Sequence, residues 1–408
     1  MKGFKCRFCE TALVHRVVDL GMSPLCESYL EERQLDRMEP FYPLHVWVCH
    51  ECFLVQLNEY VRAEEIFTEY AYFSSYSSSW LKHAEDYVAM ISERLGLGEQ
   101  SFVVELASND GYLLQYFVKR GIPCLGVEPA QNVAKAAEER GVPTEVSFFD
   151  EAKGRELSAR KADLILGNNV LAQVPDLNTF VAGIPHVLKP TGTVTIEFPH
   201  LLRLFDENQF DTIYHEHFCY FSLIAAETIF ARHGMTVFDV EELWTHGGSL
   251  RIYARHTSDD TRPVSARVLE LRAREEAAGY RHVETYAHFE ERVRETKRKL
   301  LELLINIKRD GKRIAGYGAP GKGNTLLNYC GIRGDFLDFT VDRNPYKQGR
   351  YLPGTHVPIS EPERIDREKP DYIFILPWNF KDEILAQLAH AREWGARFII
   401  PIPEPTVV

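Results

Sequence analysis

The chain has 408 residues, which exceeds the size at which one hydrophobic core keeps growing, so two or three domains are expected. Hydrophobic residues make up 45% of the chain and charged residues 26%, which excludes a disordered or fibrous protein. A formal charge of −12 disfavours a nucleic-acid-binding surface. The sequence shows no apolar run of signal-peptide or membrane-span type, so we expect a cytoplasmic protein without a membrane partner.

Two Cys-x-x-Cys pairs, Cys6 with Cys9 and Cys49 with Cys52, lie among short aromatic strand-like runs near the N-terminus. Four thiolates in two chelating pairs suit tetrahedral Zn²⁺ and leave no open position for a water molecule. The pattern therefore predicts a structural zinc site in a small domain over residues 1–70. Four ordinary cysteines are the alternative, because the gap between the pairs is longer than in a compact zinc ribbon.

The centre of the chain has the pattern of an α/β domain. A serine-rich tract precedes a helical pattern that starts near Trp80 and stops at Gly96. Strands and helices then alternate, which predicts a mostly parallel sheet with helices on both faces and ligands at the carboxyl ends of its strands. The expected strands are residues 102–106, 124–128, 162–166 and 193–197.

Residues 264–309 read as long helices with a break near Gly279, and a second α/β series follows them. We therefore expect an α/β protein with a zinc-binding domain at 1–70, a Rossmann-like central domain at 71–289 and a Rossmann-like C-terminal domain at 290–408. The strands expected in the last domain are residues 314–318, 339–342, 372–376 and 398–400.

A candidate nucleoside site lies at residues 105–111, directly after the first central strand, with Glu128 at the end of the next strand. Small residues let the backbone approach a ligand at a helix N-terminus, and an acid about 20 residues further on accepts ribose hydroxyls. The loop has one glycine and an acidic first residue. This favours the cationic cofactor S-adenosylmethionine over the pyrophosphate of NAD.

Residues 211–222 concentrate acid, base and phenol groups in an aromatic segment. His215 and His217 are two positions apart, so this is not the His-Glu-x-x-His zinc motif. In an extended segment Tyr214 and Glu216 share a face, and a local bend would bring His217 to the same cavity. Buried polar groups with satisfied hydrogen bonds are the alternative to an active site.

Two glycine-rich loops, residues 245–251 and 316–324, combine backbone donors with a nearby cation and suit a phosphate. The second loop also resembles a dinucleotide fingerprint, with Asp342 at the ribose-binding distance. An NAD-dependent sugar oxidoreductase is therefore the rival enzyme, and a zinc-dependent interaction protein is the rival that is not an enzyme. Glycine turns without a ligand are the alternative for both loops.

Taken in order, these motifs resemble the sugar C-methyltransferase family of deoxysugar biosynthesis. The resemblance runs through both cysteine pairs and residues 72–76, 105–111, 168–172, 208–217, 246–251 and 316–319. It implies a zinc-binding domain, an S-adenosylmethionine domain and a C-terminal Rossmann-like domain without bound NAD. The implied substrate is a nucleoside-diphosphate 4-keto-6-deoxysugar, linked to dTDP or GDP, and the state is a monomer or a homodimer.

By the same resemblance, His217 is the general base that removes the proton from C-3 of the sugar. Tyr214, Glu216 and Gln173 position the sugar and stabilise the enolate, although the family often has histidine at position 173. Protons at C-5 share the same acidity, so methylation at C-5 is the alternative. The expected cofactor contacts are Tyr72, Ser75, Tyr76, Glu105, Ala107, Ser108, Asn109, Gly111, Tyr112, Leu113, Glu128, Pro129, Asn168 and Asn169. The expected substrate contacts are His246, Ser249, Arg251, Gly318, Lys322, Asn324, Asp342 and Lys347.

Overall fold

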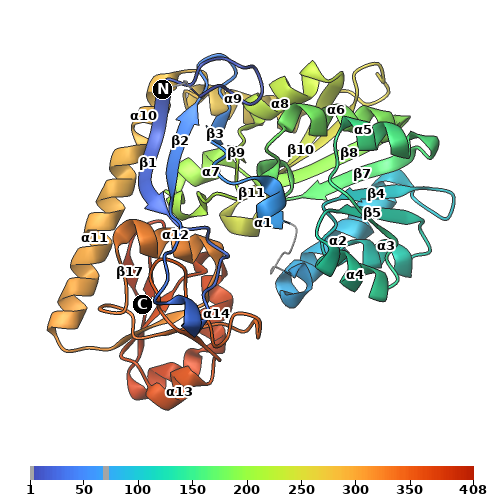
Figure 1. The fold of residues 1–408 in the computed structure, drawn as a ribbon. Coiled ribbons are helices and arrows are strands. Elements are labelled where there is room, and N and C mark those ends of the chain that lie inside the picture. Colours follow the sequence, from blue (N-terminus) through green and yellow to red (C-terminus); the bar gives the residue numbers. More distant parts are fainter. Residues whose placement is uncertain (1–3, 68–72) are drawn as a thin grey trace.

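The computed structural model describes residues 4–67 and 73–408, so the expected cofactor contact Tyr72 lies outside the described residues. In the described part, three sheets organise the chain (Figure 1). The chain is an α/β protein, as the alternation of strands and helices predicts. Among the described helices, none is both long and apolar enough to cross a membrane.

The first sheet is antiparallel and has the order β1-β2-β3-β9. Leu44, Val46 and Val48 are buried at alternate positions of β2, as expected for a strand with one face in the core. Strand β9 comes from the centre of the chain and pairs with β3, so the cysteine-bearing module packs against the residues that follow His217. The elements of this module are β1 (His15–Ser23), β2 (Tyr42–Val48), β3 (Val55–Leu57), β9 (Cys219–Tyr220) and α1 (Ala63–Phe67).

The second sheet has the order β10-β11-β8-β7-β4-β5-β6, in which β10 and β11 are antiparallel to their neighbours and the others are parallel. Val103 and Leu164 pack with helices α2 and α3 on one face, and Val104 and Ile165 pack on the other face. Figure 1 shows α2, α3 and α4 on one side and α5, α6 and α8 on the other. The strands are β4 (Val103–Leu106), β5 (Cys124–Glu128), β6 (Thr144–Val146), β7 (Ala162–Asn168), β8 (Leu188–Pro199), β10 (Met235–Leu243) and β11 (Ser249–His256). The helices are α2 (Ser78–Leu95), α3 (Leu114–Lys119), α4 (Gln131–Glu139), α5 (Glu151–Glu156), α6 (Leu177–Val187), α7 (Leu201–Asp206) and α8 (Leu223–Arg232).

Helix α2 begins and ends where the sequence predicts. The Ser77 hydroxyl accepts the backbone N–H of Trp80 at 3.2 Å, and Gly96 closes the helix with a φ of 62°. This start places Trp80 in the first turn, where its side chain lines a large cavity.

The third sheet has the order β14-β13-β12-β15-β16-β17 and is parallel except for β17. The predicted helix break is present, since α9 ends just before Gly279 and α10 starts after it. The helices are α9 (Ala266–Ala277), α10 (Val283–Ala287), α11 (Phe289–Arg309), α12 (Gly321–Cys330), α13 (Arg364–Glu368) and α14 (Lys381–Gln387). The strands are β12 (Ile314–Tyr317), β13 (Thr340–Val341), β14 (Ile359–Ser360), β15 (Tyr372–Ile375), β16 (Arg397–Ile400) and β17 (Thr406–Val407).

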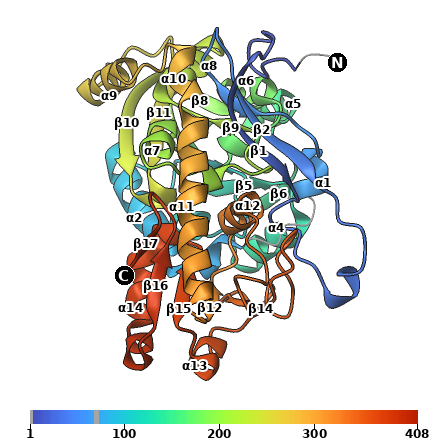
Figure 2. The ribbon, with the colours of Figure 1, turned by 90° about the vertical axis from the view of Figure 1, so that its left-hand side faces the viewer.

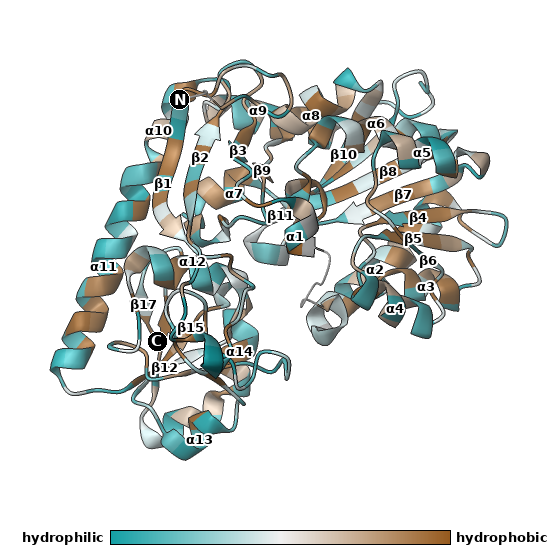
Figure 3. Ribbon diagram, in the orientation of Figure 1, coloured by the Kyte–Doolittle hydropathy of each residue, from teal (hydrophilic) through white to brown (hydrophobic). Residues whose placement is uncertain are grey.

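Helix α11 connects the first sheet with the C-terminal α/β part. Figure 2 shows it running from the first sheet to the third, and it contacts both β1 and α12. Val293, Leu300 and Leu304 are buried along its inner face. The hydrophilic colouring of its exposed turns in Figure 3 agrees with this one-sided burial. Helix α11 therefore holds the first sheet next to the C-terminal part of the chain.

Candidate active site

A cavity of about 830 Å³ lies at the carboxyl edge of the second sheet and extends to the third. This volume is near the upper end for ligand pockets, so more than one small molecule fits. The N-terminal, central and C-terminal parts of the chain all contribute residues to its lining, for example Glu27, Glu128 and Lys322 respectively.

The loop after β4 shapes one end of the cavity. Ala107 and Asn109 have left-handed φ values of 55° and 50°, which turn the chain sharply at the end of the strand. Glu128 accepts backbone N–H groups from Asn109 at 2.8 Å and from Ala130 at 2.9 Å. Burial raises the pKa of Glu128 to about 7, against the lowering effect of these two bonds. The expected cofactor contacts that line the cavity here are Tyr76, Ala107, Asn109, Tyr112, Glu128 and Pro129.

Other expected cofactor contacts lie behind the loop and do not line the cavity. Glu105 is fully buried. Burial raises the pKa of Glu105 well above its ordinary value, so a nearby cationic ligand would favour its ionised form. Ser75 bonds through its backbone N–H to Asp110 rather than facing the cavity. Ser108, Gly111 and Leu113 are the remaining residues of this group.

Asn168 and Asn169 lie where β7 ends, and both line the cavity. Asn168 Nδ2 and Asn169 Oδ1 are buried without a hydrogen-bond partner in the described part of the chain. Asn169 Nδ2 lies 2.6 Å from Nε2 of His246, which also lines the cavity. Buried amide groups of this kind fit a polar ligand, because an unmet buried hydrogen bond is costly.

The segment after the short helix Phe210–Thr212 turns as the sequence analysis anticipates. The backbone N–H of His217 donates to the Tyr214 carbonyl at 2.9 Å, and the two side-chain rings lie 4.1 Å apart. Phe218 donates its N–H to Ala172 at 2.7 Å, which brings Gln173 alongside. Tyr214, Glu216, His217 and Gln173 all line the cavity.

The hydrogen bond of His217 defines its tautomer. Nδ1 lies 3.0 Å from the Thr212 carbonyl oxygen, which can only accept, so Nδ1 carries the proton. Burial lowers the pKa of His217 to about 3, so the imidazole is neutral near pH 7. Nε2 therefore keeps a free lone pair and can accept a proton.

Arg251 and Ser249 do not line the cavity. Arg251 is 3% exposed and pairs with Glu197 at 2.7 Å and with Glu241 at 3.0 Å. The Ser249 hydroxyl donates to the Thr245 carbonyl at 3.0 Å. Both side chains therefore make their polar contacts with other residues of the central domain.

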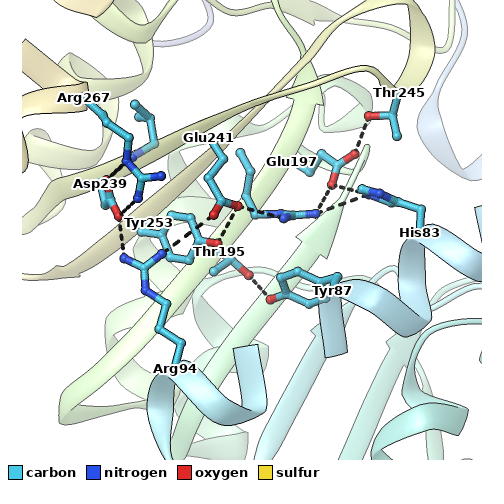
Figure 4. Close-up of polar contacts among 12 residues, drawn as sticks. His83, Tyr87, Arg94, Thr195, Glu197, Asp239, Glu241, Thr245, Tyr253 and Arg267 are labelled. Carbon is cyan, nitrogen blue, oxygen red and sulfur yellow. Dashed lines mark hydrogen bonds and ion pairs between the residues drawn. The ribbon is translucent and has the colours of Figure 1, made fainter. Parts of the chain in front are cut away.

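Glu197, which the sequence analysis did not single out, is the centre of this network. Figure 4 shows its carboxylate between Thr245 and His83, whose side chains donate to it at 2.7 and 3.0 Å. Burial would raise the pKa of Glu197, but Arg251 and His83 lower it to about 2. His83 stacks on Trp80, a cavity residue. The only sequence signal for Glu197 was its place at the end of a parallel strand.

The glycine loop before α12 forms the opposite end of the cavity. Gly318 has a φ of 88°, and a Cβ there would lie 2.5 Å from Pro377. Nζ of Lys322 donates to Oδ1 of Asn379 at 3.0 Å. Asn324 is buried elsewhere and donates to the Cys26 carbonyl at 2.6 Å. The expected substrate contacts that line the cavity are His246, Gly318, Lys322, Asp342 and Lys347.

The four cysteines of the N-terminal module form a cluster away from this cavity. Their Sγ atoms all lie within 4.8 Å of one another, with Cys6–Cys52 at 3.5 Å and Cys9–Cys49 at 3.4 Å. Sulfur atoms about 2.3 Å from a tetrahedral zinc lie about 3.8 Å apart, so the cluster fits Zn²⁺. Gln56 donates to Cys6 at 3.1 Å, which supports the ligand from behind.

Known protein families match the chain in three consecutive parts. A domain described as zinc binding matches residues 6–67, a methyltransferase domain matches 80–240, and the C-methyltransferase C-terminal domain matches 244–403. The C-methyltransferase NovU of Streptomyces niveus is 37% identical over 406 residues, which are 99% of this chain and 96% of NovU.

Two similar solved methyltransferase structures each cover 43% of the chain. An S-adenosylmethionine-dependent methyltransferase from Clostridium acetobutylicum is 13% identical, with a TM-score of 0.35 over 43% of this chain and 92% of its own. Magnesium protoporphyrin IX methyltransferase (ChlM) from Synechocystis, with bound S-adenosylmethionine, is 12% identical, with a TM-score of 0.32 over 43% and 78%. The likeness to NovU over nearly the whole chain, with the three domains in order, shows that this chain belongs to the S-adenosylmethionine-dependent C-methyltransferases that carry a zinc-binding domain.

Proposed function

We propose that the enzyme methylates C-3 of a nucleoside-diphosphate 4-keto-6-deoxysugar, with dTDP or GDP as the nucleotide. The observation that carries this proposal is the neutral imidazole of His217, with its proton on Nδ1, in a cavity that joins the cofactor loop to the C-terminal domain. A carbon beside a ketone becomes a nucleophile once a base removes its proton. Nε2 of His217 is placed for that step.

In the proposed reaction, Nε2 of His217 accepts the C-3 proton, and the electron pair of the C–H bond forms the enolate with its charge on the C-4 oxygen. Burial raises the pKa of Tyr214 well above its ordinary value, so its phenol stays a hydrogen-bond donor. Tyr214 and the Gln173 amide are the donors we assign to the enolate oxygen, and Glu216 positions the ring. When bound, S-adenosylmethionine would supply the methyl group for C-3: its S–CH3 bond would break, the electron pair would stay on sulfur, and S-adenosylhomocysteine would be the leaving group.

We assign the three parts of the chain to three tasks. Residues 1–70 hold zinc, residues 71–289 hold S-adenosylmethionine, and residues 290–408 contribute to binding the sugar nucleotide. Arg343 lies on the cavity wall of the C-terminal part and provides positive charge for a diphosphate. The Arg251 guanidinium is already paired, so we assign it to supporting the loop that carries His246.

The test incubates the zinc-loaded enzyme with S-adenosylmethionine and, separately, dTDP- and GDP-linked 4-keto-6-deoxyhexose. NMR then locates the new methyl group. A methyl at C-3 supports the proposal, and a methyl at C-5 supports the alternative position. Oxidation of NADH in a parallel incubation with NADH in place of S-adenosylmethionine, with no methylation in the first, supports the oxidoreductase.

His217→Asn should reduce turnover by about 10³-fold, because asparagine cannot act as the base. Calorimetric binding of S-adenosylhomocysteine serves as the control and should stay within about threefold of wild type, since residue 217 lies outside the loop after β4. Near-normal turnover of the variant would remove His217 from the mechanism.

A further inference from the structure

Glu27, a carboxylate of the zinc-binding module, lies on the wall of the reaction cavity. It shares this wall with Tyr214 and Glu216, and its side chain is 16% exposed. Its neighbour Cys26 donates its thiol hydrogen to Glu216 at 3.5 Å. Glu27 is therefore next to the segment that carries the reacting groups, although it is almost 200 positions away in the sequence.

The C-terminal domain fixes the backbone on both sides of Glu27. Asn324 donates to the Cys26 carbonyl at 2.6 Å, and the Tyr29 hydroxyl donates to the Ala319 carbonyl at 2.6 Å. Leu30 and Tyr351 exchange two backbone hydrogen bonds of 3.0 and 2.9 Å. These contacts hold Glu27 at a defined position between the two domains.

The Glu27 carboxylate lies where the start of helix α12 would attract an anion. Oε1 is 3.3 Å from the place that a Cβ of Gly321, the first residue of α12, would take. Oε2 pairs with Nζ of Lys347 at 3.5 Å. Nζ also donates to the Ala319 carbonyl at 2.8 Å, so this buried ammonium is already engaged.

Charge balance argues against a phosphate at this position. Burial would lower the pKa of Lys347, but the carboxylates of Glu27 and Asp342 raise it, so the ammonium stays charged. Two carboxylates thus face one ammonium on this wall. A diphosphate placed here would meet net negative charge, whereas a hydroxyl group would meet hydrogen-bond acceptors.

We propose that Glu27 is a substrate-recognition residue, which accepts hydrogen bonds from hydroxyl groups of the sugar ring and keeps the diphosphate away from the start of α12. The inference rests on the proposed function, because it takes the ligand to be a sugar nucleotide. Oε2 of Glu27 is buried and lies 3.5 Å from the Lys347 ammonium; a carboxylate has about four lone-pair sites, so Glu27 keeps acceptor capacity for a hydroxyl. A sugar whose C-3 lies at His217 reaches Glu27, because Tyr214 and Glu216 lie beside His217 in the sequence and line the same cavity as Glu27.

The test measures binding by calorimetry to the full-length, zinc-loaded enzyme with saturating S-adenosylhomocysteine. The ligands are dTDP- and GDP-linked 4-keto-6-deoxyhexose and the matching free nucleoside diphosphates. Glu27→Gln keeps the shape of the side chain and removes its charge. We expect it to weaken binding of the sugar nucleotide about 10- to 100-fold. Binding of the free diphosphate should stay within about threefold of wild type or become tighter.

Glu31→Gln is the matched control, since Glu31 lies in the same segment, is 44% exposed and pairs with Arg33 at 2.6 Å. It should bind both ligands like wild type. Equal weakening of both ligands by Glu27→Gln, or no weakening of the sugar nucleotide, overturns the inference. If Glu27→Gln does not fold, Glu27→Asp replaces it with the same expected pattern.

The two proposals fail separately. A wild-type enzyme that binds the sugar nucleotide but transfers no methyl to it contradicts the proposed function, and the binding ratio of Glu27→Gln still decides the role of this residue. A wild-type enzyme that binds neither sugar nucleotide overturns both.

Discussion

At the residue scale, we expect Glu128, the proposed ribose acceptor, to make cofactor binding depend on pH. Its carboxylate is buried beside the loop after β4 and accepts two backbone N–H groups, and burial raises its pKa to about 7. Below pH 7 the carboxyl is increasingly protonated, and a protonated carboxyl is a poorer acceptor for ribose hydroxyls. The affinity for S-adenosylhomocysteine should therefore rise about tenfold between pH 6 and pH 8.

Calorimetry at these two pH values checks the prediction. Glu128→Gln is the control, because its amide does not titrate: binding should be weak and should not change over the same range. A wild-type affinity that stays constant from pH 6 to pH 8 would show that the ionisation of Glu128 does not control cofactor binding.

At the element scale, the cofactor loop rests on strand β5 through a glycine. A Cβ on Gly126 would lie 2.3 Å from Oγ and 2.8 Å from Cβ of Ser108. The Ser108 side chain is fully buried. Gly126→Ala should therefore push the loop outward and lower the free energy of unfolding by about 1–3 kcal/mol. It should also weaken binding of S-adenosylhomocysteine, because Ala107 and Asn109 move with the loop.

Urea denaturation and calorimetry measure the two effects. Gly98→Ala is the matched control, since nothing lies within 4 Å of a Cβ at that position. It should leave stability within about 0.5 kcal/mol and binding unchanged. If both glycine variants behave alike, the packing of Ser108 against β5 does not shape the loop.

Local elements were predictable from the sequence because their signals are local. Period-two and helical patterns with Ser77 and Gly96 as caps define α2 and the central strands within a few residues. Strands β10 and β11 were not among the expected strands, and of the strands that were expected β8 differs most in length. The pattern predicted residues 193–197, but the strand runs from Leu188 to Pro199, because its first residues pair with β7 across a register shift.

The candidate site was predictable only where side chains follow strand ends or loops. Glu128 and Asn168 fall in this class, and both line the cavity. Arg251 was expected at the substrate, but its partner Glu197 is 54 positions away, and no local pattern reveals such a pair. Glu27 was not anticipated for the same reason, since it reaches the cavity only through the docking of one module on another.

At the scale of the whole molecule, the zinc-binding module and the reacting segment share a sheet. The backbone N–H of Leu57 donates to the Phe218 carbonyl at 2.9 Å, and β3 continues this pairing with β9. His217 directly precedes Phe218. Zinc is therefore expected to stabilise the position of His217, the proposed base, through this sheet.

Cys9→Ser tests this coupling, because serine keeps the size of the side chain and loses the thiolate ligand. We expect zinc to fall from about one ion per chain to near zero, the melting temperature to drop, and turnover to decrease more than about tenfold. Affinity for S-adenosylhomocysteine should change less than about threefold, since the cofactor loop belongs to the second sheet. Cys124→Ala, a buried cysteine outside the cluster, is the control that should retain zinc and turnover. Full turnover in a variant that has lost its zinc would show that zinc is not needed to hold residues 211–222 in place.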